Sequence, residues 1–77
     1  MPDARLNLRG LKCPLPALKT RKALQGLAPG DLIVVECTDP LAAIDIPALL
    51  QETGDRLEGQ ESGDGSLVFT IRKSAGS

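Results

Sequence analysis

Two prolines near the amino terminus, Pro14 and Pro16, constrain the fold of this chain more than any other feature. Proline has a fixed φ angle and no amide hydrogen, so it suits the first turn of a helix, where the amides are unpaired anyway. Residues 5–9, just before them, alternate polar and apolar side chains as a half-buried strand does. Segment 9–16 is therefore predicted to be the junction at which a strand ends and a helix begins.

Cys13 lies at this junction, directly before the first proline. If Pro14 is the first helical residue, Cys13 is the N-cap, where the helix dipole and free amides favour a negative sulfur. Arg9 and Lys12 add positive charge close to it. We therefore expect an exposed, reactive thiolate with a pKa below the value of about 8.5 for a free cysteine. The alternative is a buried structural thiol.

The remaining patterns predict six elements, in the order strand 5–9, helix 14–28, strand 31–38, helix 40–53, and strands 55–61 and 66–72. Asp39 is expected to cap the second helix, with Pro40 in its first position, and Pro47 to break that helix in two. The order β-α-β-α-β-β is typical of a two-layer α/β sandwich (α+β), in which two helices pack on one face of a four-stranded mixed sheet.

A chain of 77 residues suffices for one small domain, which we expect to span residues 1–73, with frayed residues 1–4 and a disordered tail at 74–77. The polar strand 55–61 is expected at an edge of the sheet. Cys37 shares a strand face with Ile33 and Val35, so it is predicted to be a core thiol.

Composition excludes several functions. The chain has no histidine, which rules out a Cys–His dyad, and two cysteines are too few for a four-cysteine zinc site. We expect no metal. The only aromatic residue is Phe69, so the stacking surface typical of single-stranded nucleic-acid binding is missing.

No stretch reaches the roughly 18–20 apolar residues of a membrane span, and no signal peptide is evident, which favours the reducing cytoplasm.

Charge is unevenly distributed along the chain. Residues 1–22 carry six basic side chains and one acidic one, whereas residues 31–64 carry nine acidic side chains and one basic one. A basic surface near Cys13 would suit an acidic partner or an anionic sulfur species. The candidate partner-binding residues are Arg9, Lys19, Arg21 and Lys22.

The motif Gly10-Leu11-Lys12-Cys13-Pro14-Leu15-Pro16 resembles the glycine-x-x-Cys-Pro-x-Pro signature of the TusA/SirA-like sulfur-carrier proteins. The similarity covers residues 6–73 and continues through Arg21-Lys22, Pro29-Gly30, Asp39-Pro40, Asp45-Ile46-Pro47 and Ile71-Arg72-Lys73. Leu15 departs from the branch that acts on transfer RNA, which often has an acidic residue there.

The resemblance implies a carrier rather than a free-standing enzyme. In it, Cys13 accepts a sulfane sulfur as a persulfide from a cysteine desulfurase or rhodanese-like donor and relays it to an acceptor protein, for example for 2-thiouridine formation in transfer RNA or for sulfur oxidation. Gly10, Lys12, Pro14 and Pro16 would support the site, and Asp39 would lie beside it as a docking residue. No cofactor is expected other than the transient persulfide, and we expect a monomer.

The sequence is also compatible with two alternative functions. One is a regulatory module in which Cys13 senses oxidation. The other is an RNA-binding module, because the expected fold resembles a domain of a bacterial translation initiation factor. The missing aromatics and the net charge of −1 argue against direct nucleic-acid binding. Sulfur exchange needs an accessible thiolate and a good leaving group and no histidine base, which fits this composition.

Overall fold

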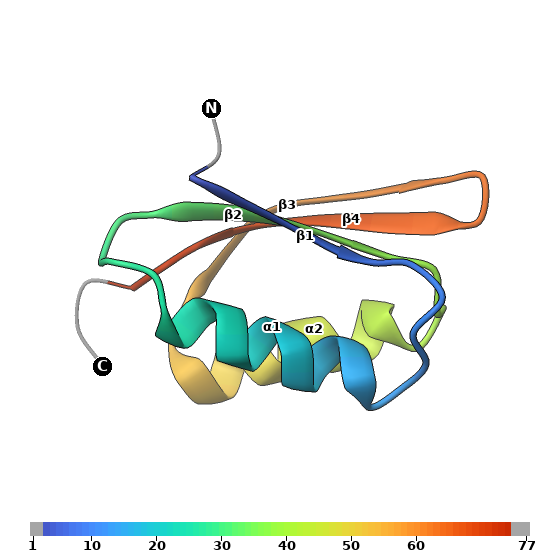
Figure 1. Cartoon of the computed structure of the whole chain (residues 1–77), viewed down its shortest axis with the longest axis horizontal. Helices are drawn as coiled ribbons and strands as arrows, with labels where there is room; N and C mark the ends of the chain where they lie inside the picture. The colour runs from blue at the N-terminus through green and yellow to red at the C-terminus, as the bar shows by residue number, and fades with distance from the viewer. Residues whose placement is uncertain (1–2, 75–77) are drawn as a thin grey trace.

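Strands and helices alternate in the order that the sequence predicts. The computed structural model describes residues 3–74, and it contains β1 (Ala4–Leu8), α1 (Leu15–Gln25), β2 (Leu32–Cys37), α2 (Ala42–Thr53), β3 (Arg56–Gly63) and β4 (Ser66–Arg72). Both helices lie on the same side of the four-stranded sheet (Figure 1). The predicted two-layer α/β sandwich is confirmed.

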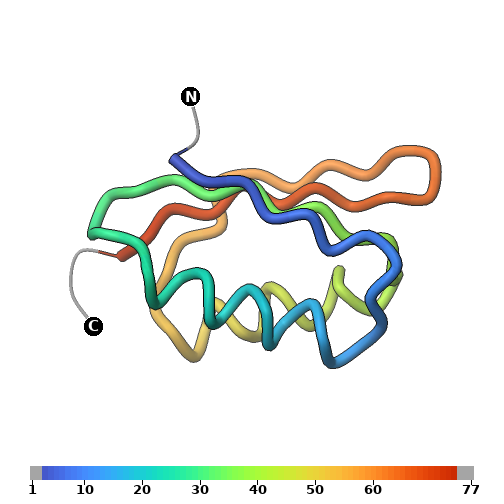
Figure 2. Tube along the Cα trace, in the orientation of Figure 1, coloured from blue at the N-terminus to red at the C-terminus, as the bar shows by residue number. Residues whose placement is uncertain are grey.

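The sheet has the strand order β1-β2-β4-β3. β1 is parallel to β2, with Leu8 opposite Cys37, and β4 is antiparallel to both β2 and β3. Because the carboxyl ends of β1 and β2 lie at the same edge of the sheet, the loops that follow them, residues 9–14 and 38–41, come side by side (Figure 2). This juxtaposition builds the candidate site.

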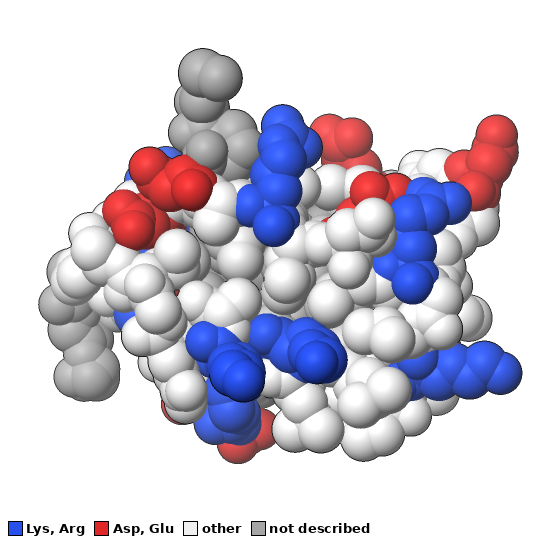
Figure 3. All heavy atoms as spheres, in the orientation of Figure 1, with Lys and Arg blue, Asp and Glu red and all other residues white. Residues whose placement is uncertain are grey.

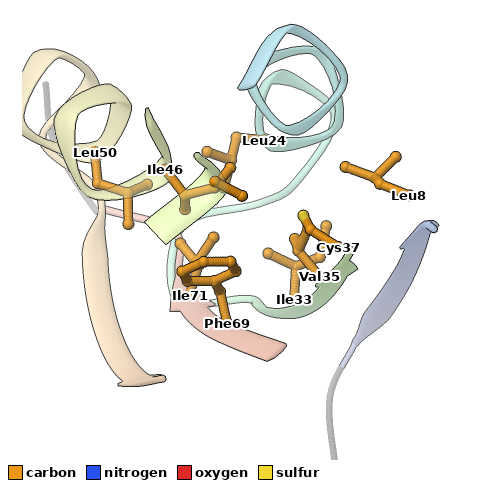
Figure 4. Close-up of a cluster of buried hydrophobic side chains, with 10 residues drawn as sticks. Leu8, Leu24, Ile33, Val35, Cys37, Ile46, Leu50, Phe69 and Ile71 are labelled. Atoms are coloured by element: carbon orange, nitrogen blue, oxygen red, sulfur yellow. The ribbon is translucent and has the colours of Figure 1, made fainter. Parts of the chain in front are cut away.

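The core lies between the sheet and the two helices (Figure 4). Alternate residues of β2 and β4 point into it, as the period of two in the sequence predicts. Cys37 is fully buried beside Val35 and Phe69, and its thiol is free. The prediction that Cys37 is a core thiol is confirmed.

The first helix begins later than the sequence predicts. α1 starts at Leu15 with Pro14 as its N-cap, so Cys13 is not the N-cap but lies one residue outside the helix. The Cys13–Pro14 peptide bond is cis, and the Leu15 amide donates to the Lys12 carbonyl at 2.8 Å. A tight turn therefore comes before the helix. α1 also ends at Gln25, three residues before the predicted end at Ala28.

The second helix differs from the prediction in both its start and its continuity. Its N-cap is Leu41 rather than Asp39, and it runs unbroken through Pro47 to Thr53. One apolar stripe, formed by Ala42, Ile46, Leu49 and Leu50, is buried along its length. Pro47 cannot donate a backbone hydrogen bond within the helix, and packing of this stripe against the sheet offsets that loss. Tertiary contacts therefore override the tendency of proline to break a helix. Gly54, at φ +81°, ends the helix as expected.

The hairpin and the chain ends also differ slightly from the prediction. β3 is an edge strand, as expected, but it extends to Gly63, so only Asp64 and Gly65 form the turn. Ala4 pairs with β2 rather than fraying, the amide of Asp3 donates to the Leu32 carbonyl at 2.7 Å, and the amide of Ser74 donates to Asp55 at 2.8 Å. The rest of the expected frayed start and tail, residues 1–2 and 75–77, lies outside the described residues.

Candidate functional site

The loop after β1 is shaped by Gly10. This residue has a φ angle of +85°, which an L side chain rarely adopts. The turn brings the Gly10 amide to within 2.8 Å of the Thr38 hydroxyl, which accepts its hydrogen bond. The loop that carries Cys13 is thereby joined to the loop that follows β2, and the supporting role of Gly10 stays a prediction.

Cys13 is exposed, and two aspartates hold it in place. Its amide donates to Oδ2 of Asp39 at 2.6 Å, and its Sγ donates to Oδ2 of Asp45 at 2.7 Å. The other oxygen of Asp39 accepts the Leu41 amide at 3.0 Å. Asp39 lies in the loop after β2 and Asp45 in the first turn of α2, so a segment distant in sequence positions the cysteine.

Asp45 is a site residue that the sequence analysis misses. The sequence pattern contains it only in the Asp45-Ile46-Pro47 match, whose Pro47 is the residue expected to break the helix. In the structure it lies in the first turn of α2 and faces the thiol. The signal that could have identified it is an aspartate in the first turn of the helix that follows β2, the strand that pairs with β1.

The electrostatics of Cys13 are the reverse of those expected. The hydrogen bond to Asp45, loss of hydration, and the negative charges of Asp45 and Asp39 raise the pKa of the Cys13 thiol. The prediction of a lowered pKa is therefore wrong. The physical reason is that Cys13 does not cap α1 and that its nearest charged neighbours are carboxylates. Hydrogen bonds from the amides of Cys13 and Leu41 lower the pKa of Asp39, which favours its charged form.

The predicted basic residues are only partly available to a partner. Arg9 forms an ion pair with Glu36, and Arg21 forms one with Glu52 at 3.3 Å. Among residues 3–74, the side chains of Lys12, Lys19 and Lys22 form no ion pair, although the positive charge of Lys12 acts on Asp39. Several basic side chains occur on the face of the molecule that carries α1 (Figure 3). This face remains the candidate docking surface.

Two open hollows flank Cys13. One, of about 520 Å³, lies between the loops after β1 and β2 and is lined by Gly10, Leu11, Lys12, Cys13, Thr38, Asp39, Pro40 and Leu41. The other, of about 230 Å³, lies between the helices, and its lining includes Pro14, Leu18 and Asp45. Leu18 and Leu41 are both more than half exposed. The thiol is thus reached from two sides across partly apolar surface.

The predicted site residues are brought together only in part. Gly10, Lys12 and Asp39 line the hollow at Cys13, and Pro14 lines the adjacent one. Pro16 lies buried in the first turn of α1, where its carbonyl accepts a hydrogen bond from the Thr20 hydroxyl, and it lines neither hollow. Within the described part of the chain, no cluster of three or more Cys, Asp or Glu side chains could hold a metal ion.

The protein has two helices on a four-stranded mixed sheet, and one exposed cysteine lies at the junction of the first strand and the first helix. No cluster of metal-ligating side chains occurs in the described part of the chain. These features define a class of small proteins whose candidate functional group is a thiol. Residues 4–73 match the family model described as "Sulfurtransferase TusA". The sulfur carrier protein TusA of Allochromatium vinosum is 36% identical over 72 residues, which are 94% of this chain and 95% of that protein. The corresponding protein of Pseudomonas putida strain F1 is 38% identical over 74 residues, 96% of this chain and 92% of that protein. The chain belongs to the TusA family of sulfur carriers.

A solved structure supports the fold independently. The SirA-like protein from Desulfitobacterium hafniense superposes with a TM-score of 0.80, covering 92% of this chain and 97% of that one. The two sequences are 22% identical, so this likeness concerns the fold alone. In addition, none of the helices among residues 3–74 is long and apolar enough to cross a membrane.

Proposed function

We propose that Cys13 is the residue that carries the sulfur, as a persulfide. The observation that carries this proposal is the contrast between the two cysteines: Cys13 is exposed between two hollows, whereas Cys37 is fully buried. A sulfur carrier must present its sulfur to two different proteins in turn. Of the two thiols in the chain, only that of Cys13 can be reached without unfolding.

The proposed step conserves atoms and electrons. The Sγ of Cys13 attacks the terminal sulfur of a donor persulfide, a new S–S bond forms, and the S–S bond of the donor breaks. The donor cysteine leaves with the bonding electron pair and takes up the proton that Sγ gives up. Cys13 is oxidised to the persulfide as the donor cysteine is reduced to a thiol, so the exchange needs no external oxidant.

The burial of Cys37 suits this chemistry. A second accessible thiol could attack a persulfide on Cys13, form a disulfide and expel sulfide. Cys37 lies beneath the helices, and it is a free thiol with no exposed surface. The carried sulfur is thereby protected from loss within the same molecule.

The proposed partners follow from the same step. A cysteine desulfurase or a rhodanese-like protein would supply the sulfur, and a downstream acceptor protein would take it, for example for the thiolation of transfer RNA. The cytoplasm, where thiols stay reduced, is the proposed location. The open hollows support docking of folded partners near the thiol, as do Lys19 and Lys22 on α1, which form no ion pair among residues 3–74.

The test is protein mass after incubation with a desulfurase, cysteine and pyridoxal phosphate. We expect the wild-type protein to gain the mass of one sulfur atom, reversibly with a reducing agent, and Cys13→Ser to gain none while keeping the wild-type circular dichroism spectrum. Cys37→Ala should still accept sulfur. Loading of Cys13→Ser at the wild-type rate would overturn the proposal. A mass change that appears only with peroxide would favour the redox-sensing alternative.

A further inference from the structure

The carboxylate of Asp45 lies in direct contact with the thiol. Its Oδ2 is 2.7 Å from Sγ of Cys13 and accepts the thiol hydrogen. Asp45 is held in place by the first turn of α2, where its amide donates to the Leu41 carbonyl at 2.9 Å. The residue that carries this carboxylate thus belongs to a hydrogen-bonded helical turn rather than to a loop.

The other charged groups around this contact do not neutralise Asp45. Arg21 and Glu52 line the same groove, but they pair with each other. Lys12 acts on Asp39, whose carboxylate faces the Cys13 amide from the opposite loop. Within residues 3–74, Asp45 itself forms no ion pair. The thiol therefore faces an uncompensated negative charge in the free carrier.

We propose that Asp45 is a positioning residue that keeps Cys13 protonated and directs its Sγ into the groove between the helices while the carrier holds no sulfur. This inference rests on the proposed role of Cys13 as the sulfur-carrying residue. A persulfide has no hydrogen on Sγ, so the hydrogen bond to Asp45 exists in the unloaded form alone. The contact therefore distinguishes the empty carrier from the loaded one, and it restrains the empty thiol from reacting with small oxidants and electrophiles, because the nucleophile in those reactions is the thiolate.

The test compares the pH dependence of alkylation of Cys13 by iodoacetamide, with the labelled residue identified by mass spectrometry. Asp45→Asn keeps the size of the side chain and removes its charge. We expect the midpoint of its rate profile to move to lower pH, with a several-fold faster reaction at neutral pH. We also expect a lower plateau at high pH, because a less basic thiolate is a weaker nucleophile. Asp64→Asn, the same change in the β3–β4 turn, should leave the wild-type profile unchanged.

Asp45→Glu separates charge from packing. It keeps the carboxylate, so its midpoint should lie closer to that of the wild type than to that of Asp45→Asn. The proposal is overturned if the Asn variant has a midpoint at or above the wild-type value, or if the Glu and Asn variants share the same lowered midpoint. Iodoacetamide carries no sulfur to transfer, so these outcomes are independent of the loading experiment on Cys13→Ser.

Discussion

At the scale of single residues, Asp39 connects the two loops that form the site. One of its oxygens accepts the amide of Cys13, and the other accepts the amide of Leu41. Both bonds are charge-assisted, which makes them stronger than bonds between neutral groups. The residue therefore fixes the position of the Cys13 backbone, in addition to any contact with a partner.

Replacing Asp39 with asparagine tests this role. The two amides bond to different oxygens of Asp39, and in asparagine one of these oxygens is replaced by an NH2 group, which cannot accept a hydrogen bond. We expect hydrogen exchange at the amide of Cys13 or Leu41 to become several-fold faster, while the amides in the centre of β2 keep their wild-type protection. Unchanged protection at both amides would contradict this account. Asp64→Asn again serves as the matched control.

At the scale of elements, the basic face of α1 is the candidate surface for donor docking. Lys19 and Lys22 project from it without an ion pair among the described residues, whereas Arg21 is tied to Glu52 of α2. Exposed charges at the rim of an interface chiefly set the rate of encounter and its dependence on salt. A test of docking should therefore change the two lysines and leave Arg21 in place, so that the contact between the helices is kept.

We expect Lys19→Glu/Lys22→Glu to accept sulfur from a donor protein more slowly than the wild type at low salt. The difference should shrink as salt is added, because screening weakens both the native attraction and the introduced repulsion. Transfer from a small neutral trisulfide should be nearly unchanged, since Cys13 and Asp45 are untouched. If the double variant loads from the desulfurase at the wild-type rate in low salt, the basic face is simply a solvated surface.

At the scale of the whole molecule, Cys37 links the stability of the domain to pH. Burial, with the negative charges of Asp39 and Glu36, raises the pKa of the Cys37 thiol from 9.0 to about 11. The unfolded chain therefore loses this proton at a lower pH than the folded protein does. Stability due to this group is fully present below about pH 9 and is lost as the pH rises toward 11.

Chemical denaturation between pH 7 and pH 11 tests this link, in a Cys13→Ser background that removes the other thiol. We expect Cys37→Ala to lower the free energy of unfolding by about 1–2 kcal/mol at pH 7, because it leaves a small cavity in the core. The loss of stability toward pH 11 should then be smaller than in the parent, by about 2 kcal/mol. Parallel curves for the two proteins would show that Cys37 does not titrate with unfolding. In the Cys13-containing chain, Cys37→Ala should leave sulfur transfer intact.

The sequence alone determined the order of elements, the single exposed cysteine and the core position of Cys37. These features depend on side-chain periods of two and about 3.6 and on the backbone limits of proline and glycine, which act over a few neighbouring residues. The alternation Ile33, Val35, Cys37 is an example, because it places the thiol inside whatever packs on that face.

Only the tertiary structure decided the charge that surrounds Cys13. Asp39 and Asp45 are 26 and 32 residues away from it in sequence, and they meet it because β1 and β2 are parallel neighbours. Of the basic residues that are close in sequence, Arg9 and Arg21 pair with Glu36 and Glu52, and the positive charge of Lys12 acts on Asp39. Packing also decided that α2 runs through Pro47. Electrostatic interactions depend on distance in space, which a local pattern does not contain.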